Sequence, residues 1–456
     1  MSQPEVAVIG GGLAGCECAF QIARFGIPVT LFEMRPETQS EAHQSGELAE
    51  LVCSNSFRAR GLANAVGLIK EEMRRLGGMI MSVADKVDVP AGGAHAVDRE
   101  AFARGVTELV EAHEGIRVMR KRIDSLDDPE LSAFAVVILS TGPLTGGGLA
   151  EDIARRTGKD RLYFYDAIAP VVDADSVNRE RVFTASRYGK GGDDYINCPM
   201  DKELYNHFID ELLAAEKIAL NEADEARFFP GCQPIEEIAR LGRMSPAFGP
   251  MKPVGLRDPA TGRRPFAVVQ LRLENRKGTA FNLVGFQTRL KYPEQKRVFQ
   301  MIPGLEEASF LRLGSVHRNT YVDTPRVLDS RLRLRNDARI RFAGQITGVE
   351  GYVESTACGL LQGLFTAAEI LGLELPVPPE ETALGAMLAH LLNDLNPDFQ
   401  PSNIHWGHFP PMTHDSEGKK LPGGRKGRPA RREAMSGRAL EALSELDLWL
   451  TNQLGN

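Results

Sequence analysis

Short apolar runs and amphipathic segments alternate at the start of the chain, a pattern typical of an α/β domain. Val6–Ile9 is entirely apolar, as expected of a buried parallel strand. Apolar residues at helical spacing follow over residues 13–23, and a second apolar run covers residues 29–32. The order predicts a strand, a helix and a second strand of one parallel sheet.

Further elements are predicted downstream. Residues 62–76 and 97–112 have helical patterns, the second with Asp98 as its N-cap. Residues 134–139 form an apolar run, which predicts a strand that enters a ligand-facing turn. The three glycines at 146–148 predict a chain crossing between domains.

The middle of the chain has a different pattern. Residues 162–172 and 181–188 are strand-like, and residues 201–220 carry apolar positions at helical spacing. Residues 266–273 and 280–286 flank a polar turn, which predicts an antiparallel hairpin. Because this pairing departs from the doubly wound pattern, it predicts an inserted α+β domain.

The last part of the chain contains two ambiguous segments. Residues 340–345 form a strand that enters a glycine turn, and a helix is predicted over about residues 356–370. This unit is either an ordinary βα crossover or a helix N-terminus aimed at a flavin. Residues 419–432 hold seven basic and no acidic residues, with Gly and Pro that favour a mobile loop, either a solvated linker or a phosphate-binding arm.

Glycines in G-x-G-x-x-G spacing follow the first strand. Gly10 permits a tight turn, Gly12 lets the backbone approach a pyrophosphate, and Gly15 allows close packing of helix on strand. Glu33, at the end of the second strand, is placed to accept hydrogen bonds from a ribose. This ordered set predicts a dinucleotide site.

Composition narrows the class of protein. The 456 residues are 43% hydrophobic and 25% charged, with a net charge of −7, which excludes a uniformly basic nucleic-acid binder but not a local basic face. No apolar run is long enough to span a bilayer, and the first strand leaves no room for a signal peptide. Six cysteines are too sparse for a disulfide framework, so a cytoplasmic protein is expected, and zinc-ligand spacing is missing.

Two cysteines lie in settings that favour reactivity. Cys53 lies in a Ser/Asn-rich segment, and Cys232 lies between prolines just before a predicted helix, where a thiol pKa is lowered. On residues alone, each could be catalytic or structural. Cys16, Cys18 and Cys358 are predicted to be packing residues because they lie on predicted helices. The role of Cys198, which precedes a proline, is left undecided.

Several motifs together carry a family resemblance. They are GGGLAG at 10–15, LVCSNS at 51–56, GCQPIE at 231–236, HRNT at 317–320 and GQITGVEGY at 344–352. The chain closely resembles the folate- and FAD-dependent tRNA (uracil-5-)-methyltransferases, the TrmFO family, over nearly its whole length. The late glycine segment is also similar to the GidA family, which modifies the wobble uridine of tRNA and has an extended helical C-terminal region that this chain lacks.

The resemblance implies a fold and a cofactor site. The expected fold is α/β, a Rossmann-like FAD-binding domain of the glutathione-reductase type (residues 1–150 and 335–456) with an inserted α+β substrate domain (residues 151–334). The expected FAD-binding residues are Gly10, Gly11, Gly12, Leu13, Ala14, Gly15 and Glu33, together with Gly344, Gln345, Gly351 and Tyr352. Tyr352 and His317 are also candidates for folate contacts.

The resemblance also implies a reaction. The one-carbon unit of 5,10-methylenetetrahydrofolate is expected to pass through the flavin to C5 of the T-loop uridine of tRNA, with NADPH or NADH as reductant. Cys232 is expected to add to C6 of the uracil, and Cys53 to remove the C5 proton or protect the flavin-bound methylene. The alternatives are the same chemistry on ribosomal RNA, and a GidA-like flavoprotein that transfers no methyl group. Neither membrane nor metal is expected, and the oligomeric state is left open.

Overall fold

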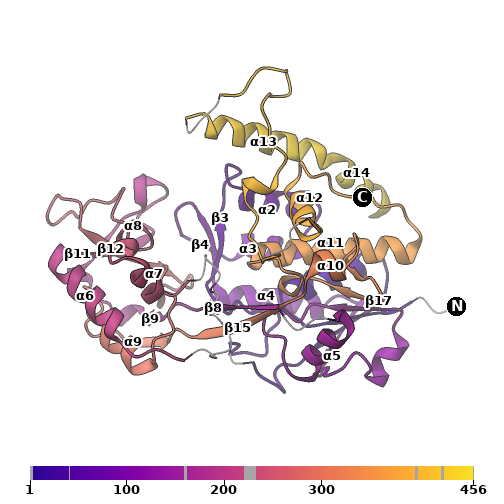
Figure 1. Cartoon of the computed structure of the whole chain (residues 1–456), viewed down its shortest axis with the longest axis horizontal. Helices are drawn as coiled ribbons and strands as arrows, with labels where there is room; N and C mark the ends of the chain where they lie inside the picture. Colours follow the sequence, from indigo (N-terminus) through magenta and orange to yellow (C-terminus); the bar gives the residue numbers. More distant parts are fainter. Residues whose placement is uncertain are drawn as a thin grey trace.

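The computed structural model describes residues 4–40, 42–158, 162–219, 228, 233–395, 399–422 and 426–454, with the side chains of 162–166 and 317–318 excepted. The chain forms two large hydrophobic cores, each built around its own six-stranded sheet (Figure 1). Over the described residues, none of the helices combines the length and the apolar character needed to cross a bilayer.

The first sheet has the strand order β16-β17-β7-β1-β2-β6. Its strands are β16 (Arg333–Leu334), β17 (Asp337–Phe342), β7 (Val136–Leu139), β1 (Val6–Ile9), β2 (Val29–Glu33) and β6 (Ile116–Arg120). β1 pairs in parallel with β2 on one side and β7 on the other, which confirms the predicted strand–helix–strand unit. In such a sheet, ligands bind beyond the carboxyl ends of the strands where the strand order reverses. Here that point is the end of β1.

Two helices beside this sheet pack closely against each other. α1 (Leu13–Ala23) packs closely on α11 (Tyr352–Leu371): a Cβ on Gly359 would lie 2.3 Å from the Ala14 carbonyl oxygen, and one on Gly363 would lie 2.9 Å from the Cys18 carbonyl oxygen. Because both contacts advance in the same chain direction, the helices run parallel with their N-termini at the same end. Further helices around this core are α2 (Ala65–Arg75), α3 (Met79–Lys86), α4 (Arg99–Glu111), α5 (Gly147–Thr157), α10 (Thr324–Val327), α12 (Ala383–Leu391), α13 (Arg428–Ala442) and α14 (Ser444–Leu454).

The second sheet is antiparallel, in the order β10-β11-β12-β13-β9-β14. Its strands are β10 (Phe183–Thr184), β11 (Tyr195–Met200), β12 (Ala267–Leu273), β13 (Ala280–Leu283), β9 (Val171–Asp173) and β14 (Phe310–Arg312), covered by α6 (Lys202–Ala214), α7 (Ile235–Leu241), α8 (Ser245–Phe248) and α9 (Tyr292–Phe299). Leu271 lies opposite Leu283, so the predicted hairpin of β12 and β13 is confirmed. The proposed boundaries at residues 150/151 and 334/335 stay a prediction.

Two smaller sheets lie between the cores (Figure 1). β8 (Leu162–Ala167) pairs with β15 (Val316–Tyr321), and β3 (Ser56–Ala59) joins β5 (Ala94–Val97) and β4 (Asp88–Val89). β3 follows the Cys53 segment directly, so this segment lies where the two cores meet.

Three predicted elements differ in the structure. The glycines at 146–148, predicted to mark a chain crossing between domains, instead lie at the N-terminus of α5. The helix forms there because Leu149, Ala150 and Ile153 provide an apolar face that is buried. α11 begins at Tyr352, before the expected start at residue 356. Within the basic segment predicted as a loop, residues from Arg428 onward are helical, because the buried side chains of α13, including Met435 and Ala439, pack on the main core.

Candidate active site

The glycine turn after β1 leaves space at one position only among its three motif glycines. A Cβ on Gly10, whose φ is +105°, would lie 2.6 Å from the Ser140 carbonyl oxygen, and one on Gly15 would lie 1.9 Å from the Gly10 carbonyl oxygen. A Cβ on Gly12 would meet no atom within 4 Å. Gly10 and Gly15 therefore shape the turn by permitting close backbone packing, whereas Gly12, the N-cap of α1, borders open space at a helix N-terminus suited to an anion.

Glu33 is held rigidly at the end of β2. One carboxylate oxygen accepts a 2.8 Å hydrogen bond from the Gly11 N–H, and the other accepts from the backbone N–H and Nε of Arg35 at 3.0 and 2.9 Å. Burial acts to raise the pKa of Glu33, but the Arg35 side chain and these hydrogen bonds outweigh it, so the pKa lies below its ordinary value. The ionised carboxylate keeps acceptor capacity for a ribose hydroxyl.

The segment before α11 reaches the same end of α1. Gly344, at φ +78°, places its backbone where an added Cβ would lie 2.5 Å from the Ala14 Cβ. Gln345 donates to Glu350 at 2.7 Å, and Gly351, at φ +103°, is the N-cap of α11. The two predicted groups of cofactor residues therefore lie at the parallel N-termini of α1 and α11.

The backbone around Cys53 is fixed by residues far away in the sequence. The Cys53 N–H donates a 2.7 Å hydrogen bond to the Tyr352 hydroxyl. Arg312 donates to the carbonyl oxygens of Val52 and Cys53 at 3.1 and 2.9 Å. Burial, and then the nearby Arg99, lower the pKa of Arg312 to about 10, so it stays a cation at neutral pH. The backbone of the Cys53 segment is therefore held in a fixed position, and Cys53 itself is partly exposed.

Asn55, two residues later, connects the Cys53 segment to both cores. Its amide nitrogen donates to the Val97 carbonyl at 2.9 Å and to the Leu273 carbonyl at 2.8 Å, while its oxygen accepts from Arg272 at 2.9 Å. The Asn of the LVCSNS motif thus holds the segment to both cores, a role that could not be assigned from sequence because its partners are distant along the chain.

A buried acid in the first turn of α11 was missed from sequence. One Glu354 oxygen accepts from the Ile404 N–H at 2.8 Å and pairs with Arg58. The other oxygen has no hydrogen-bond partner among the described residues, although the side chain is buried. A buried, unmatched acceptor beside the predicted flavin end fits a site that takes a ligand with N–H or O–H donors. The only local signal was an acidic residue in the first turn of a largely apolar helix.

Four of the other cysteines are buried, and the fifth lies outside the described residues. Cys16, Cys18 and Cys358 are fully buried, which confirms their packing role, and Cys198 is buried in β11. Burial raises the pKa of all four thiols, that of Cys358 to about 11. Cys232 lies outside the described residues, as does the side chain of His317. The described part of the chain contains no group of three or more His, Cys, Asp or Glu arranged to hold a metal.

Comparison with known proteins gives a consistent set of relatives. The family model for glucose inhibited division protein A matches residues 5–374. Methylenetetrahydrofolate–tRNA-(uracil-5-)-methyltransferase TrmFO from Syntrophotalea carbinolica is 54% identical over 441 residues, which cover 97% of this chain and 93% of that protein. The Geobacter sulfurreducens protein of the same name is 54% identical over 446 residues, 98% of each chain. A solved structure of Aquifex aeolicus GidA superposes with a TM-score of 0.70 at 16% identity, over 99% of this chain and 75% of that one.

Proposed function

Because this chain belongs to the GidA family and, within it, to the TrmFO enzymes, we propose that it is a methylenetetrahydrofolate–tRNA-(uracil-5-)-methyltransferase. The observation that carries the proposal is 54% identity to TrmFO enzymes over nearly the full length of both chains. The reaction forms 5-methyluridine in tRNA, with 5,10-methylenetetrahydrofolate as one-carbon donor, FAD as cofactor and NADPH or NADH as reductant. Within tRNA, we assign the T-loop uridine as the nucleotide that is methylated.

The two alternatives are less well supported. The chain covers 93% and 98% of the TrmFO relatives but 75% of the Aquifex GidA chain, which favours a TrmFO enzyme over a GidA-like protein. The names of these relatives specify tRNA, which favours tRNA over ribosomal RNA.

The residues at the two parallel helix N-termini suit FAD. Gly12 borders open space for a pyrophosphate, Glu33 offers an ionised acceptor to a ribose, and Glu354 offers an unmatched buried oxygen. When bound, FAD supplies the redox chemistry that turns the one-carbon unit into a methyl group. Gly10, Gly11, Gly12, Leu13, Ala14, Gly15, Glu33, Gly344, Gln345, Gly351 and Tyr352 are the residues we assign to its binding.

We assign the covalent step to Cys232. Uracil C5 is a poor nucleophile until a group adds at C6, and a thiolate is suited both to that addition and to the later elimination. Cys53 is the candidate base for the C5 proton. Its backbone is tied to Tyr352 and Arg312, which supports a fixed position for the thiol during proton removal.

The test is transfer of a labelled one-carbon unit from methylenetetrahydrofolate to unmodified tRNA transcript, with NADPH and the full chain. Labelled 5-methyluridine in the T loop is expected. Labelling of ribosomal RNA alone, or of neither RNA by a protein that holds FAD, would overturn the proposal.

The same assay tests the nucleophile. The Cys232→Ala variant should keep bound FAD and lose methyl transfer, whereas the Cys198→Ala control, which alters a buried thiol of β11, should retain both. An active Cys232→Ala protein would refute the assignment while leaving the overall function intact.

A further inference from the structure

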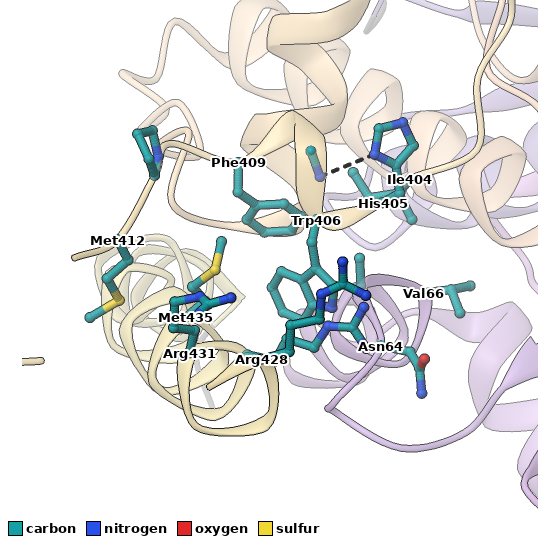
Figure 2. Close-up of a pocket in the computed structure, with 14 residues that line it drawn as sticks. Asn64, Val66, Ile404, His405, Trp406, Phe409, Met412, Arg428, Arg431 and Met435 are labelled. Carbon is teal, nitrogen blue, oxygen red and sulfur yellow. Dashed lines mark hydrogen bonds between the residues drawn. The ribbon is translucent and has the colours of Figure 1, made fainter. Parts of the chain in front are cut away.

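A pocket of about 870 Å³ lies between the start of α2, the segment 404–412 and α13 (Figure 2). Trp406 and Phe409 lie side by side in it, with ring centroids 4.8 Å apart. α13 contributes Arg428, Arg431 and Arg432 to the lining. None of the residues assigned to FAD or to methyl transfer lines this pocket.

The pocket is strongly basic. None of its fourteen lining residues is acidic. Arg431 donates to the Pro422 carbonyl oxygen, but among the described residues no carboxylate forms an ion pair with Arg428 or Arg432. Arg428 and Arg432 lie one turn apart on α13, so their like charges repel each other, and a bound anion relieves that repulsion. The exposed Lys419, Lys420 and Lys426 lie close by in the sequence and add to the positive charge.

The pocket connects to the Cys53 side of the molecule through two segments. Trp406 Nε1 donates a 3.0 Å hydrogen bond to the carbonyl of Ala63, which lies between β3 and α2. Ile404, also in the lining, donates its N–H to Glu354 in the first turn of α11. These bonds place the pocket just beyond the end of β3, whose start follows the Cys53 segment.

We propose that the pocket binds an unpaired nucleotide of the RNA substrate, with a phosphate on Arg428 and Arg432 and the base against Trp406 and Phe409. Arginine pairs with phosphate in a bidentate manner, and aromatic side chains stack on bases exposed in RNA loops. A pyridine dinucleotide fits less well, because the pocket lacks both a glycine-rich phosphate turn and an acid for the ribose. The inference rests on the proposed function, since it takes tRNA as the substrate.

Binding of unmodified tRNA transcript to the FAD-loaded full chain tests the site over a range of salt concentrations. The double variant Arg428→Glu/Arg432→Glu should weaken binding by about tenfold or more and reduce the slope of log K against log salt by roughly 0.7–0.9, the contribution of one lost phosphate contact. FAD content and NADPH oxidation should stay unchanged. Arg104→Glu, an exposed arginine of α4, is the matched charge control and should leave tRNA binding near wild type.

Aromatic variants test the base contact separately. Trp406→Leu should weaken tRNA binding several-fold, whereas Trp406→Phe, which also loses the bond to Ala63 but keeps a ring, should recover most of it. Unchanged tRNA affinity and salt slope in the arginine double variant would overturn the proposal. So would a rise in the KM for NADPH with tRNA binding unaffected. Because wild-type methyl transfer is measured independently, failure of this site is distinguishable from failure of the proposed function.

Discussion

The hydroxyl of Tyr352 accepts a 2.7 Å hydrogen bond from the backbone N–H of Cys53, although the two residues are 299 positions apart in the sequence. Tyr352 is the first residue of α11, the helix that packs on α1. Burial raises the pKa of Tyr352, so the phenol keeps its proton and can donate as well as accept. The start of α11 therefore fixes the thiol segment relative to the predicted cofactor site.

Tyr352→Phe tests this connection. The variant leaves the Cys53 N–H without its partner, which costs about 1–3 kcal/mol when such a group is buried. We expect kcat for methyl transfer to fall by about tenfold or more with FAD still bound, because the substitution keeps the ring and backbone of residue 352 and removes only the hydroxyl that bonds to Cys53. Tyr292→Phe, at a tyrosine that is 55% exposed on α9, should behave as wild type. Full activity of Tyr352→Phe would contradict a positioning role for the hydroxyl.

Gly12→Val tests the placement of the pyrophosphate. Because a Cβ at this position meets no protein atom within 4 Å, the variant should fold normally. The valine side chain should occupy the space that the cofactor needs, so the purified protein should have lost its flavin absorbance. Gly437→Val, also without atoms within 4 Å, is the control and should stay yellow. A fully flavinated Gly12→Val protein would refute the placement.

Gly359→Ala tests the contact between α1 and α11. Its Cβ would lie 2.3 Å from the Ala14 carbonyl oxygen, so the helices must separate. We expect a loss of roughly 1–3 kcal/mol in the free energy of unfolding, as for overpacked cores, measured by urea denaturation. Gly437→Ala, in the open on α13, should change stability little or raise it slightly. Equal stability of the two variants would argue against the close packing.

Acid should destabilise the protein through stacked histidines. Burial, followed by the neighbouring His390 and His405, lowers the pKa of His408 to about 3. Since the unfolded state takes up this proton near pH 6.5 and the folded state does not, stability is lost as the pH falls from about 6.5 towards 3. The Tm of His408→Phe should fall less steeply than that of the wild type over this window, as measured by thermal scans at constant ionic strength. Parallel Tm profiles would exclude His408 as a source of the dependence.

Local pattern was enough to predict the unit from Val6 to Glu33, because its apolar strands, glycine spacing and helical periodicity all lie within one short segment. The Asp98 cap of α4 was predicted for the same reason, and its side chain accepts the Ala101 N–H at 3.1 Å. Glu354 could not be found in this way, because its role depends on Arg58 and Ile404, both distant in sequence. Nor could the helix α13, whose glycine, proline and charges favour a loop until tertiary packing buries Met435.

The Asn55 amide hydrogen-bonds at once to β5 beside the main core and to the end of β12 in the second sheet. A hinge motion that separated the two bodies here would leave the buried Asn55 amide and at least one backbone carbonyl without a hydrogen-bond partner. Any opening that admits a large polymer is therefore expected to pivot about this residue rather than to separate at it. Cys53, two positions away, would then keep its distance to both bodies during such an opening.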